Sequence, residues 1–197
     1  MKKLFIGSQN KHKIDEINAI LKNNDLNIEL FSPFSFNDDS DPIENGLSFE
    51  ENATIKAKFY FDKYHLPTIG EDSGICIDYL KGLPGIYSKR FFDDLNNYDK
   101  NEKIIELLKN ADNRNAHFVT CICYIDEKGD THIFNGINNG TIAFKQAGHE
   151  GFGYDPIFVI PEFNKTEAEL GNDYKNENSH RARAFKEFIN YLKTYEK

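Results

Sequence analysis

The segment that most constrains the fold is the strand-like run from His117 to Ile125, which is apolar at both of its alternating sets of positions. A strand of this kind is buried on both faces, so it lies in the middle of a sheet that other elements cover on each side. Elsewhere, short apolar runs such as Leu4 to Ile6 alternate with stretches of helical periodicity such as Ile14 to Leu21. Strands interleaved with helices predict a mixed α/β fold.

Turn and cap signals place the other elements. Ser48 and Glu51 have the spacing of a capping box, which predicts a helix that begins there. The polar run Glu71 to Gly74 is expected to form a tight turn between strands at 68–69 and 75–79. The remaining predictions are a helix around 104–108, a hairpin partner strand at 131–137, a strand at 157–160 and a C-terminal helix that begins near Ser179.

The length and charge of the chain limit its organisation and its partners. The 197 residues, 39% of them hydrophobic, can bury the core of one domain. No repeat, low-complexity tract or linker divides them, so we expect a single domain spanning residues 1–197. There are 24 lysines and arginines against 32 aspartates and glutamates, a net charge of −8. This sign argues against nucleic acid as a partner, but a small polyanionic ligand held by a local group of cations stays open.

The sequence also bears on the compartment. No stretch reaches the roughly 20 apolar residues needed to span a bilayer, and the apolar run after Lys3 is too short for a signal peptide. Cys76, Cys121 and Cys123 form no C-x-x-C pair, which suits free thiols in a reducing compartment. Cys121 and Cys123 share one face of a strand and are expected in the core. We therefore expect a soluble, cytoplasmic protein with no membrane partner.

The first candidate site is the segment Ser8-Gln9-Asn10-Lys11-His12-Lys13, between a strand and a helix that Asn10 would cap. Backbone N–H groups at a helix N-terminus bind phosphate, and neighbouring lysines add charge. The spacing is not that of a P-loop. An ordinary helix start with solvated lysines is the alternative.

The second candidate is Glu71-Asp72-Ser73-Gly74. Carboxylates on loops at strand ends are typical ligands of Mg²⁺, which takes one or two of them together with substrate phosphate. Glu44, in an acidic loop before the capping box, is a candidate for the second carboxylate. The alternatives are an Asx turn at Asp72 and a solvated loop charge at Glu44.

The third and fourth candidates lie toward the C-terminus. In Gly151-Phe152-Gly153-Tyr154-Asp155-Pro156, the glycines let backbone and ring approach a flat ligand, and Asp155 can accept hydrogen bonds from a base edge. A glycine-rich turn with aromatic anchors is the alternative. The fourth is Lys175 with Ser179-His180-Arg181, where cations in a first helical turn oppose the helix dipole and so indicate function. A solvated helix start is its alternative.

The order and spacing of these four segments, together with Glu44-Asn45-Gly46, Phe49 to Ala53, Lys56 and Leu83 to Ser88, resemble the inosine triphosphate pyrophosphatase family. These house-cleaning nucleotidases hydrolyse deaminated purine nucleoside triphosphates. The resemblance implies an elongated mixed sheet flanked by helices, two lobes with the active site in the cleft between them, and a homodimer. It also implies Mg²⁺-dependent cleavage of ITP, dITP and XTP between the α and β phosphates, releasing a nucleoside monophosphate and pyrophosphate.

The resemblance further implies a role for individual residues. Asp72 and Lys13 would be catalytic, and Glu44 and Asp72 would bind the metal. The residues implied to bind the substrate are Ser8, Gln9, Asn10, Lys11, His12, Lys13, Lys56, Ser73, Phe152, Gly153, Tyr154, Asp155, Lys175, His180 and Arg181. In that role Arg181 would donate a hydrogen bond to a 6-keto oxygen, whereas the 6-amino group of adenine would leave the guanidinium unpaired.

The sequence departs from the family pattern at two positions. The family usually has Thr-Gly-Asn where this chain has Ser8-Gln9-Asn10, and many bacterial members have aspartate where this chain has Glu71. We assign Glu71 no firm role. Two other functions are weighed against the family's: a nucleoside triphosphate pyrophosphatase of broader or pyrimidine-directed specificity, and a non-catalytic nucleotide sensor.

Overall fold

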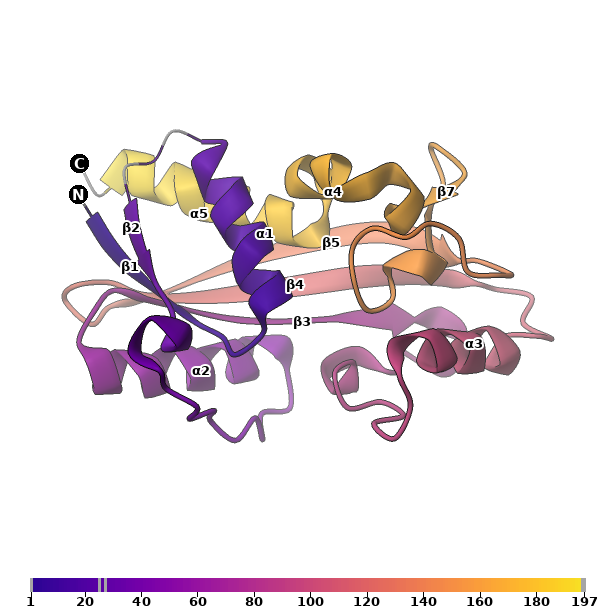
Figure 1. Ribbon diagram of the computed structural model, residues 1–197, viewed down its shortest axis with the longest axis horizontal. Coiled ribbons are helices and arrows are strands. Elements are labelled where there is room, and N and C mark those ends of the chain that lie inside the picture. The colour runs from indigo at the N-terminus through magenta and orange to yellow at the C-terminus, as the bar shows by residue number, and fades with distance from the viewer. Residues whose placement is uncertain (1, 25, 27, 196–197) are drawn as a thin grey trace. The chain divides into compact units, whose positions relative to one another are not determined.

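The computed structural model describes residues 2–24, 26 and 28–195. Within them lies one seven-stranded sheet in the order β2-β1-β3-β4-β5-β6-β7 (Figure 1). Its strands are β1 (Lys2–Gly7), β2 (Ile28–Phe31), β3 (Thr68–Ile77), β4 (Asn115–Ile125), β5 (Thr131–Ile142), β6 (Phe158–Ile160) and β7 (Lys165–Thr166). β1 pairs in parallel with β2 and β3, whereas β5, β6 and β7 pair antiparallel. The predicted α/β fold with a mixed sheet is confirmed.

The helices flank this sheet. They are α1 (Lys11–Lys22), α2 (Phe49–Tyr64), α3 (Asn97–Leu107), α4 (Glu167–Asn178) and α5 (His180–Tyr195). Short 3₁₀ helices are η1 (Pro33–Phe36), η2 (Asp78–Leu80), η3 (Gly85–Tyr87) and η4 (Asp155–Ile157). No helix in the described part of the chain has the length and apolarity needed to cross a membrane.

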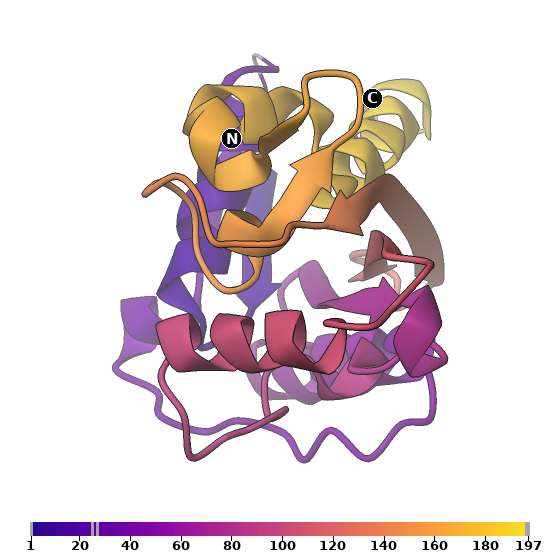
Figure 2. The same cartoon turned by 90° about the vertical axis from the view of Figure 1, so that its right-hand side faces the viewer.

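The chain divides into two compact units. Unit 1 comprises Met1–Asp72, Thr120–Gly136 and Arg181–Lys197, and unit 2 comprises Ser73–Val119 and Ile137–His180. Within unit 1, α1 and α5 cover one face of the sheet and α2 covers the other (Figure 1). Within unit 2, α3 and α4 lie on opposite sides of the strands (Figures 1 and 2). Each unit has its own buried apolar cluster.

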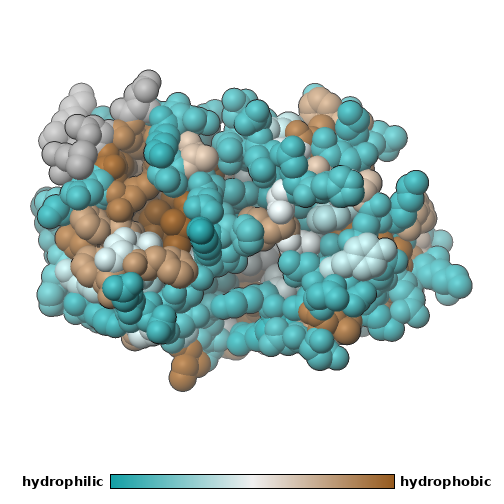
Figure 3. Space-filling view, in the orientation of Figure 1, coloured by the Kyte–Doolittle hydropathy of each residue, from teal (hydrophilic) through white to brown (hydrophobic). Residues whose placement is uncertain are grey.

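Strand β4 is buried on both faces, as its sequence predicts. Ile122 and Tyr124 pack into the core beneath α1 and α5, while Cys121 and Cys123 pack with Ala53 of α2 on the opposite face. The cysteines are free and buried, so their predicted place in the core is confirmed. The outer surface is mostly hydrophilic on the face shown in Figure 3, and apolar side chains gather there over the β1–β2 end of unit 1.

The predicted turn at Glu71 to Gly74 is wrong. These residues continue β3, which runs unbroken between β1 and β4. β1 pairs with β3 in a register that places Gly7 opposite Gly70. Beyond Gly70, the Glu71 carbonyl accepts from Lys56 Nζ and Ile75 N donates to Ser88 Oγ. Glu71 and Asp72 are buried, so these polar side chains mark a buried site rather than a turn or an Asx motif. The strand also ends earlier than predicted, at Ile77, and η2 follows.

Local signals placed most helix starts correctly. The side chain of Asn10 caps α1 by accepting a hydrogen bond from Lys13 N at 3.3 Å. Ser48 caps α2 in the same way, accepting from Glu51 N at 3.1 Å, but the Glu51 carboxylate accepts from Leu47 N rather than from the cap residue. Only half of that predicted capping box therefore forms. Strands β2 and β7 and helix α4 were not predicted.

Gly70 sets the distance between α2 and β3. A Cβ at this position would lie 2.1 Å from the carbonyl oxygen of Ala53 and 2.4 Å from the backbone nitrogen of Ala57, both on α2. We expect Gly70→Ala to destabilise the protein by about 3 kcal/mol because helix backbone would have to move. Thermal unfolding would measure this. Gly129→Ala, in open space at φ +87°, is the control and is expected to cost about 1 kcal/mol. Equal effects of the two substitutions would contradict the close approach at Gly70.

Candidate active site

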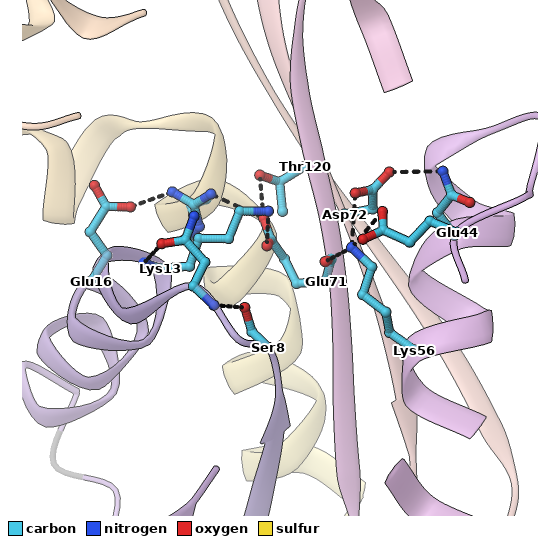
Figure 4. Close-up of polar contacts among 11 residues, drawn as sticks. Ser8, Lys13, Glu16, Glu44, Lys56, Glu71, Asp72 and Thr120 are labelled. Atoms are coloured by element: carbon cyan, nitrogen blue, oxygen red, sulfur yellow. Dashed lines mark hydrogen bonds and ion pairs between the residues drawn. The ribbon is translucent and has the colours of Figure 1, made fainter. Parts of the chain in front are cut away.

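The predicted site residues form a group in each unit. In unit 1, β3 carries Glu71 and Asp72, α1 carries Lys13 and α2 carries Lys56. Successive side chains of a strand point to opposite faces. Glu71 therefore faces α1 and α5, whereas Asp72 faces α2 (Figure 4).

Glu44, Lys56 and Asp72 form what we call the carboxylate cluster. Lys56 Nζ lies 3.0 Å from Asp72 Oδ1 and 3.1 Å from Glu44 Oε2, and it donates to the Glu71 carbonyl at 3.0 Å. Asn52 Nδ2 donates to Asp72 Oδ2 at 3.3 Å. Lys56 and Asp72 are only 6% and 5% exposed, so their charges interact with little screening by water.

The environment shifts both buried members of the carboxylate cluster. Burial raises the pKa of Asp72, Glu44 adds to the rise, and the ammonium groups of Lys56 and Lys13 offset it only in part. Burial alone would lower the pKa of Lys56, but Asp72, Glu44 and Glu71 outweigh it and raise that pKa. Lys56 thus stays charged, while Asp72 holds a proton more readily than an ordinary aspartate. A carboxylate of this kind suits general acid–base chemistry.

On the opposite face of β3, Lys13, Glu16, Glu71 and Arg181 form what we call the Arg181 cluster. Glu71 Oε2 lies 2.8 Å from Lys13 Nζ, and Glu71 Oε1 accepts hydrogen bonds from Arg181 Nη2 at 3.1 Å and Thr120 Oγ1 at 3.4 Å. Arg181 Nη1 donates to Glu16. Although burial alone would raise it, the charges of Arg181 and Lys13 hold the pKa of Glu71 well below its usual range. Glu71 is therefore an ionised, fully buried anchor for two cations.

The segment between β1 and α1 presents its backbone at the start of a helix, as predicted. Ser8 is buried, and its Oγ accepts a hydrogen bond from Asn10 N at 3.1 Å. Lys11 and His12 are exposed on the first turn of α1. Burial lowers the pKa of Lys13, and among its neighbours Glu71 opposes that shift most strongly. The sequence grouped Lys11 and Lys13 together, but Lys13 is the one that the fold brings to the buried carboxylates.

In unit 2, Gly151, Phe152, Asp155 and Lys175 form what we call the glycine-rich cluster. Asp155 Oδ2 accepts from Phe152 N at 2.7 Å and from Lys175 Nζ at 2.6 Å, and that ammonium lies 4.8 Å from the centre of the Phe152 ring. Gly151 has φ +78°, and a Cβ there would lie 2.1 Å from Asp155 Oδ2. The carboxylate of Asp155 thus fixes the loop that carries the aromatic ring.

Four more of the predicted site residues belong to unit 2. Tyr154 is buried, donates to the Ser88 carbonyl at 2.8 Å and has its pKa raised by burial to about 12. Gly153 adopts φ +63°. His180 is buried as the first residue of α5, and its ring stacks on Phe118 with centres 4.5 Å apart. Ser73 follows Asp72 in β3 and is partly exposed.

Sequence reasoning missed three side chains that hold this site. They are Glu16, Asn52 and Thr120. Glu16 lies one helical turn after Lys13, and Asn52 one turn before Lys56, so helical spacing was a usable signal for both. Asn52 accepts from Gly46 N at 2.9 Å while it donates to Asp72, which links the loop of Glu44 to β3. Thr120 carried no local signal.

The carboxylate cluster fits a divalent cation. No group of three or more histidine, cysteine or acidic ligands occurs among the described residues. Glu44 and Asp72 nevertheless converge on one ammonium, so the fold already places a positive charge between them. Two carboxylates are what Mg²⁺ commonly takes from a protein when phosphate oxygens complete its shell.

Known proteins resemble this chain over nearly its whole length. It is 42% identical over 202 residues to the dITP/XTP pyrophosphatase of Clostridium perfringens, covering 98% of each chain, and 38% identical over 196 residues to the dITP/XTP pyrophosphatase of Leptospira interrogans, again covering 98% of each. The structure of the Staphylococcus aureus Ham1 protein superposes with a TM-score of 0.87 at 34% identity, covering 100% of both chains. The sequence profile of the Ham1 family matches residues 4–191. The chain is therefore a member of the Ham1 family.

Proposed function

We propose that this protein hydrolyses the non-canonical purine nucleoside triphosphates ITP, dITP and XTP to the nucleoside monophosphate and pyrophosphate. The observation that carries the proposal is the carboxylate cluster, in which a buried Asp72 with a raised pKa lies beside Glu44 and a charged Lys56. The dITP/XTP pyrophosphatases of similar sequence support the choice of substrates.

The charges of unit 1 favour a divalent cation as cofactor. The carboxylate and Arg181 clusters hold the cations Lys13, Lys56 and Arg181 against the carboxylates of Glu16, Glu44, Glu71 and Asp72. When all are ionised, these residues alone would repel a triphosphate. Bound at Glu44 and Asp72, Mg²⁺ would supply the positive charge that stabilises the phosphates during cleavage.

Each residue of unit 1 has a distinct task in this proposal. Asp72 orients the attacking water and accepts its proton as the anhydride bond between the α and β phosphates breaks. Lys13 and Lys56 offset the charge of the departing pyrophosphate. The backbone N–H groups between Ser8 and Lys13 bind the phosphates at the start of α1. The exposed Lys11 and His12 contact the phosphates from the first turn of α1, and Ser73, which belongs to unit 2, adds a hydroxyl donor.

Residues of the glycine-rich cluster and α5 are proposed to bind the base. Phe152 stacks on the purine, with Gly153, Tyr154, Asp155 and Lys175 around it. His180 and Arg181 donate hydrogen bonds to the 6-keto oxygen. Since adenine presents a 6-amino donor instead, it would leave buried donors unpaired, and this selects against ATP. Arg181 suits the task because two carboxylates fix its guanidinium.

Product analysis tests the reaction itself. Purified protein with Mg²⁺ should convert each ITP into one IMP and one pyrophosphate, with no inorganic phosphate and no IDP. Release of inorganic phosphate would point to attack at the γ phosphate and overturn the proposal. Binding of ITP without any product would favour a nucleotide sensor. We further propose a cytoplasmic homodimer, which light scattering of the purified protein would test.

A further inference from the structure

The side chain of Gln9 lies in the phosphate-binding segment but contacts another loop. Its Nε2 donates to the carbonyl oxygen of Asp38 at 2.7 Å and to that of Ser40 at 3.0 Å. These acceptors are 29 and 31 residues away in the sequence. Both hydrogens of one amide group are thus used to hold residues 38–40.

The same loop is held against α2 by further contacts, and the Gln9 side chain also interacts with the Tyr60 hydroxyl. Tyr60 Oη donates to the Ser40 carbonyl at 2.7 Å, so this oxygen accepts from Tyr60 and Gln9 together. The Asp38 carboxylate accepts from Lys63 Nζ at 2.8 Å and from Tyr64 Oη at 2.5 Å. Residues 38–40 are therefore a fixed support, and Gln9 attaches the segment between β1 and α1 to it.

We propose that Gln9 is a positioning residue for substrate binding. Its two hydrogen bonds to residues 38–40 hold the backbone of Ser8 to Asn10 in its phosphate-binding conformation. This proposal deepens the proposed function and rests on it. Among the described residues, the other hydrogen bonds of this segment are local and involve Ser8 Oγ and the capping side chain of Asn10. Glu44 follows residues 38–40 closely in the sequence. Gln9 therefore connects the start of α1 to the loop that carries a carboxylate of the proposed active site.

A positioning role for Gln9 and a direct hydrogen bond from Gln9 to a phosphate predict different effects on KM. If Gln9 acts through residues 38–40, removing the hydroxyl of Tyr64, which donates to the Asp38 carboxylate, weakens the same support. The effects of Gln9→Met and Tyr64→Phe on the KM for ITP should then be coupled, as for residues that share a partner. If Gln9 instead donated to a phosphate, Tyr64→Phe would leave KM unchanged, and the effect of Gln9→Met would be the same in both backgrounds.

The test is a double-mutant cycle of Gln9→Met and Tyr64→Phe with ITP and Mg²⁺. We expect Gln9→Met to raise KM roughly 10-fold, which is about 1.4 kcal/mol of binding free energy, and to change kcat less than about threefold. Tyr64→Phe should raise KM by a smaller factor, and the double variant by clearly less than the product of the two. Gln146→Met removes the amide of the other glutamine, which donates to Tyr98 and Glu102, and should leave KM unchanged.

Two outcomes would overturn the proposal. One is an unchanged KM in Gln9→Met, and the other is additive effects in the cycle. If the wild-type protein released no pyrophosphate from ITP, the proposed function would fail instead. The same cycle run on the unfolding temperature would still test the contact with residues 38–40, because additive losses there would mean that Gln9 and Tyr64 do not support one loop.

Discussion

Asp72→Asn is expected to lower kcat for ITP by about 10³-fold, within the range that removal of a general acid–base group produces, while the protein unfolds at nearly the wild-type temperature. Asparagine keeps the size of the side chain but can neither take up the proton of water nor carry a charge. Lys56 Nζ would keep Glu44 and the Glu71 carbonyl as partners. The loss should therefore fall on turnover.

The direction of the pKa shift explains why stability should be spared. A carboxyl group whose pKa is raised on folding makes the folded state less stable above its unfolded pKa, because the fold disfavours the ionised form. At neutral pH, ionised Asp72 therefore costs stability, and a neutral amide removes that cost. Thermal unfolding and steady-state kinetics measure the two effects. Asp62→Asn, on the exposed side of α2, is the matched control and should change neither. A near-normal kcat in Asp72→Asn would remove Asp72 from its catalytic role.

Lys56→Met, unlike Asp72→Asn, is expected to lower the stability of the fold as well as turnover. Methionine fills the space of the lysine stem but leaves Glu44 and the buried Asp72 facing each other without a cation. Removing one partner of a buried ion pair costs about 3–5 kcal/mol, which lowers the unfolding temperature of a protein of this size by roughly 10 °C.

Mg²⁺ supplies a sharper readout for the same variant. Since a divalent cation would neutralise the two carboxylates that Lys56 leaves behind, Mg²⁺ should raise the unfolding temperature of Lys56→Met more than that of the wild type. Lys58→Met, an exposed neighbour on α2, should behave like the wild type in both measurements. Equal responses of Lys56→Met and wild type to Mg²⁺ would argue against Glu44 and Asp72 as metal ligands.

Local sequence patterns correctly predicted the elements that depend mainly on residues close together in the sequence. The doubly apolar pattern at His117 to Ile125 predicted a central strand, and helical spacing with a cap residue predicted α1 and α2. The pattern failed at Glu71 to Gly74, because a run of polar residues usually marks a solvated turn. Here the same residues stay in a buried strand because Lys13, Lys56 and Arg181 satisfy the charges of the two carboxylates.

Contacts between distant segments explain what sequence reasoning left out of the site. Arg181 meets Glu71 across 110 residues, so no local signal could give Glu71 its anchoring role. The resemblance assigns Gln9 to substrate binding, and no local signal indicated that its amide donates to a loop about 30 residues away. Lys13 and Lys56, which the resemblance assigns to phosphate binding, both lie beside β3. That they approach opposite faces of the strand follows from the position of Glu71 and Asp72 within it.

The net charge of −8 is matched by the pairing of charges within unit 1. Each buried cation of unit 1 is already paired with a carboxylate, so the protein offers a triphosphate little uncompensated positive charge. Long-range repulsion would slow the approach of such a substrate. Activity is therefore expected to depend on the divalent cation that accompanies the nucleotide.

The most direct test of the account is the ratio of kcat/KM for ITP to that for ATP, measured by pyrophosphate release with Mg²⁺. The hydrogen bonds that we propose from His180 and Arg181 to a 6-keto oxygen predict that ITP is preferred by at least about 10²-fold, because adenine would leave these donors unpaired. Equal values of kcat/KM for ITP and ATP would contradict the claim that the site selects deaminated purines.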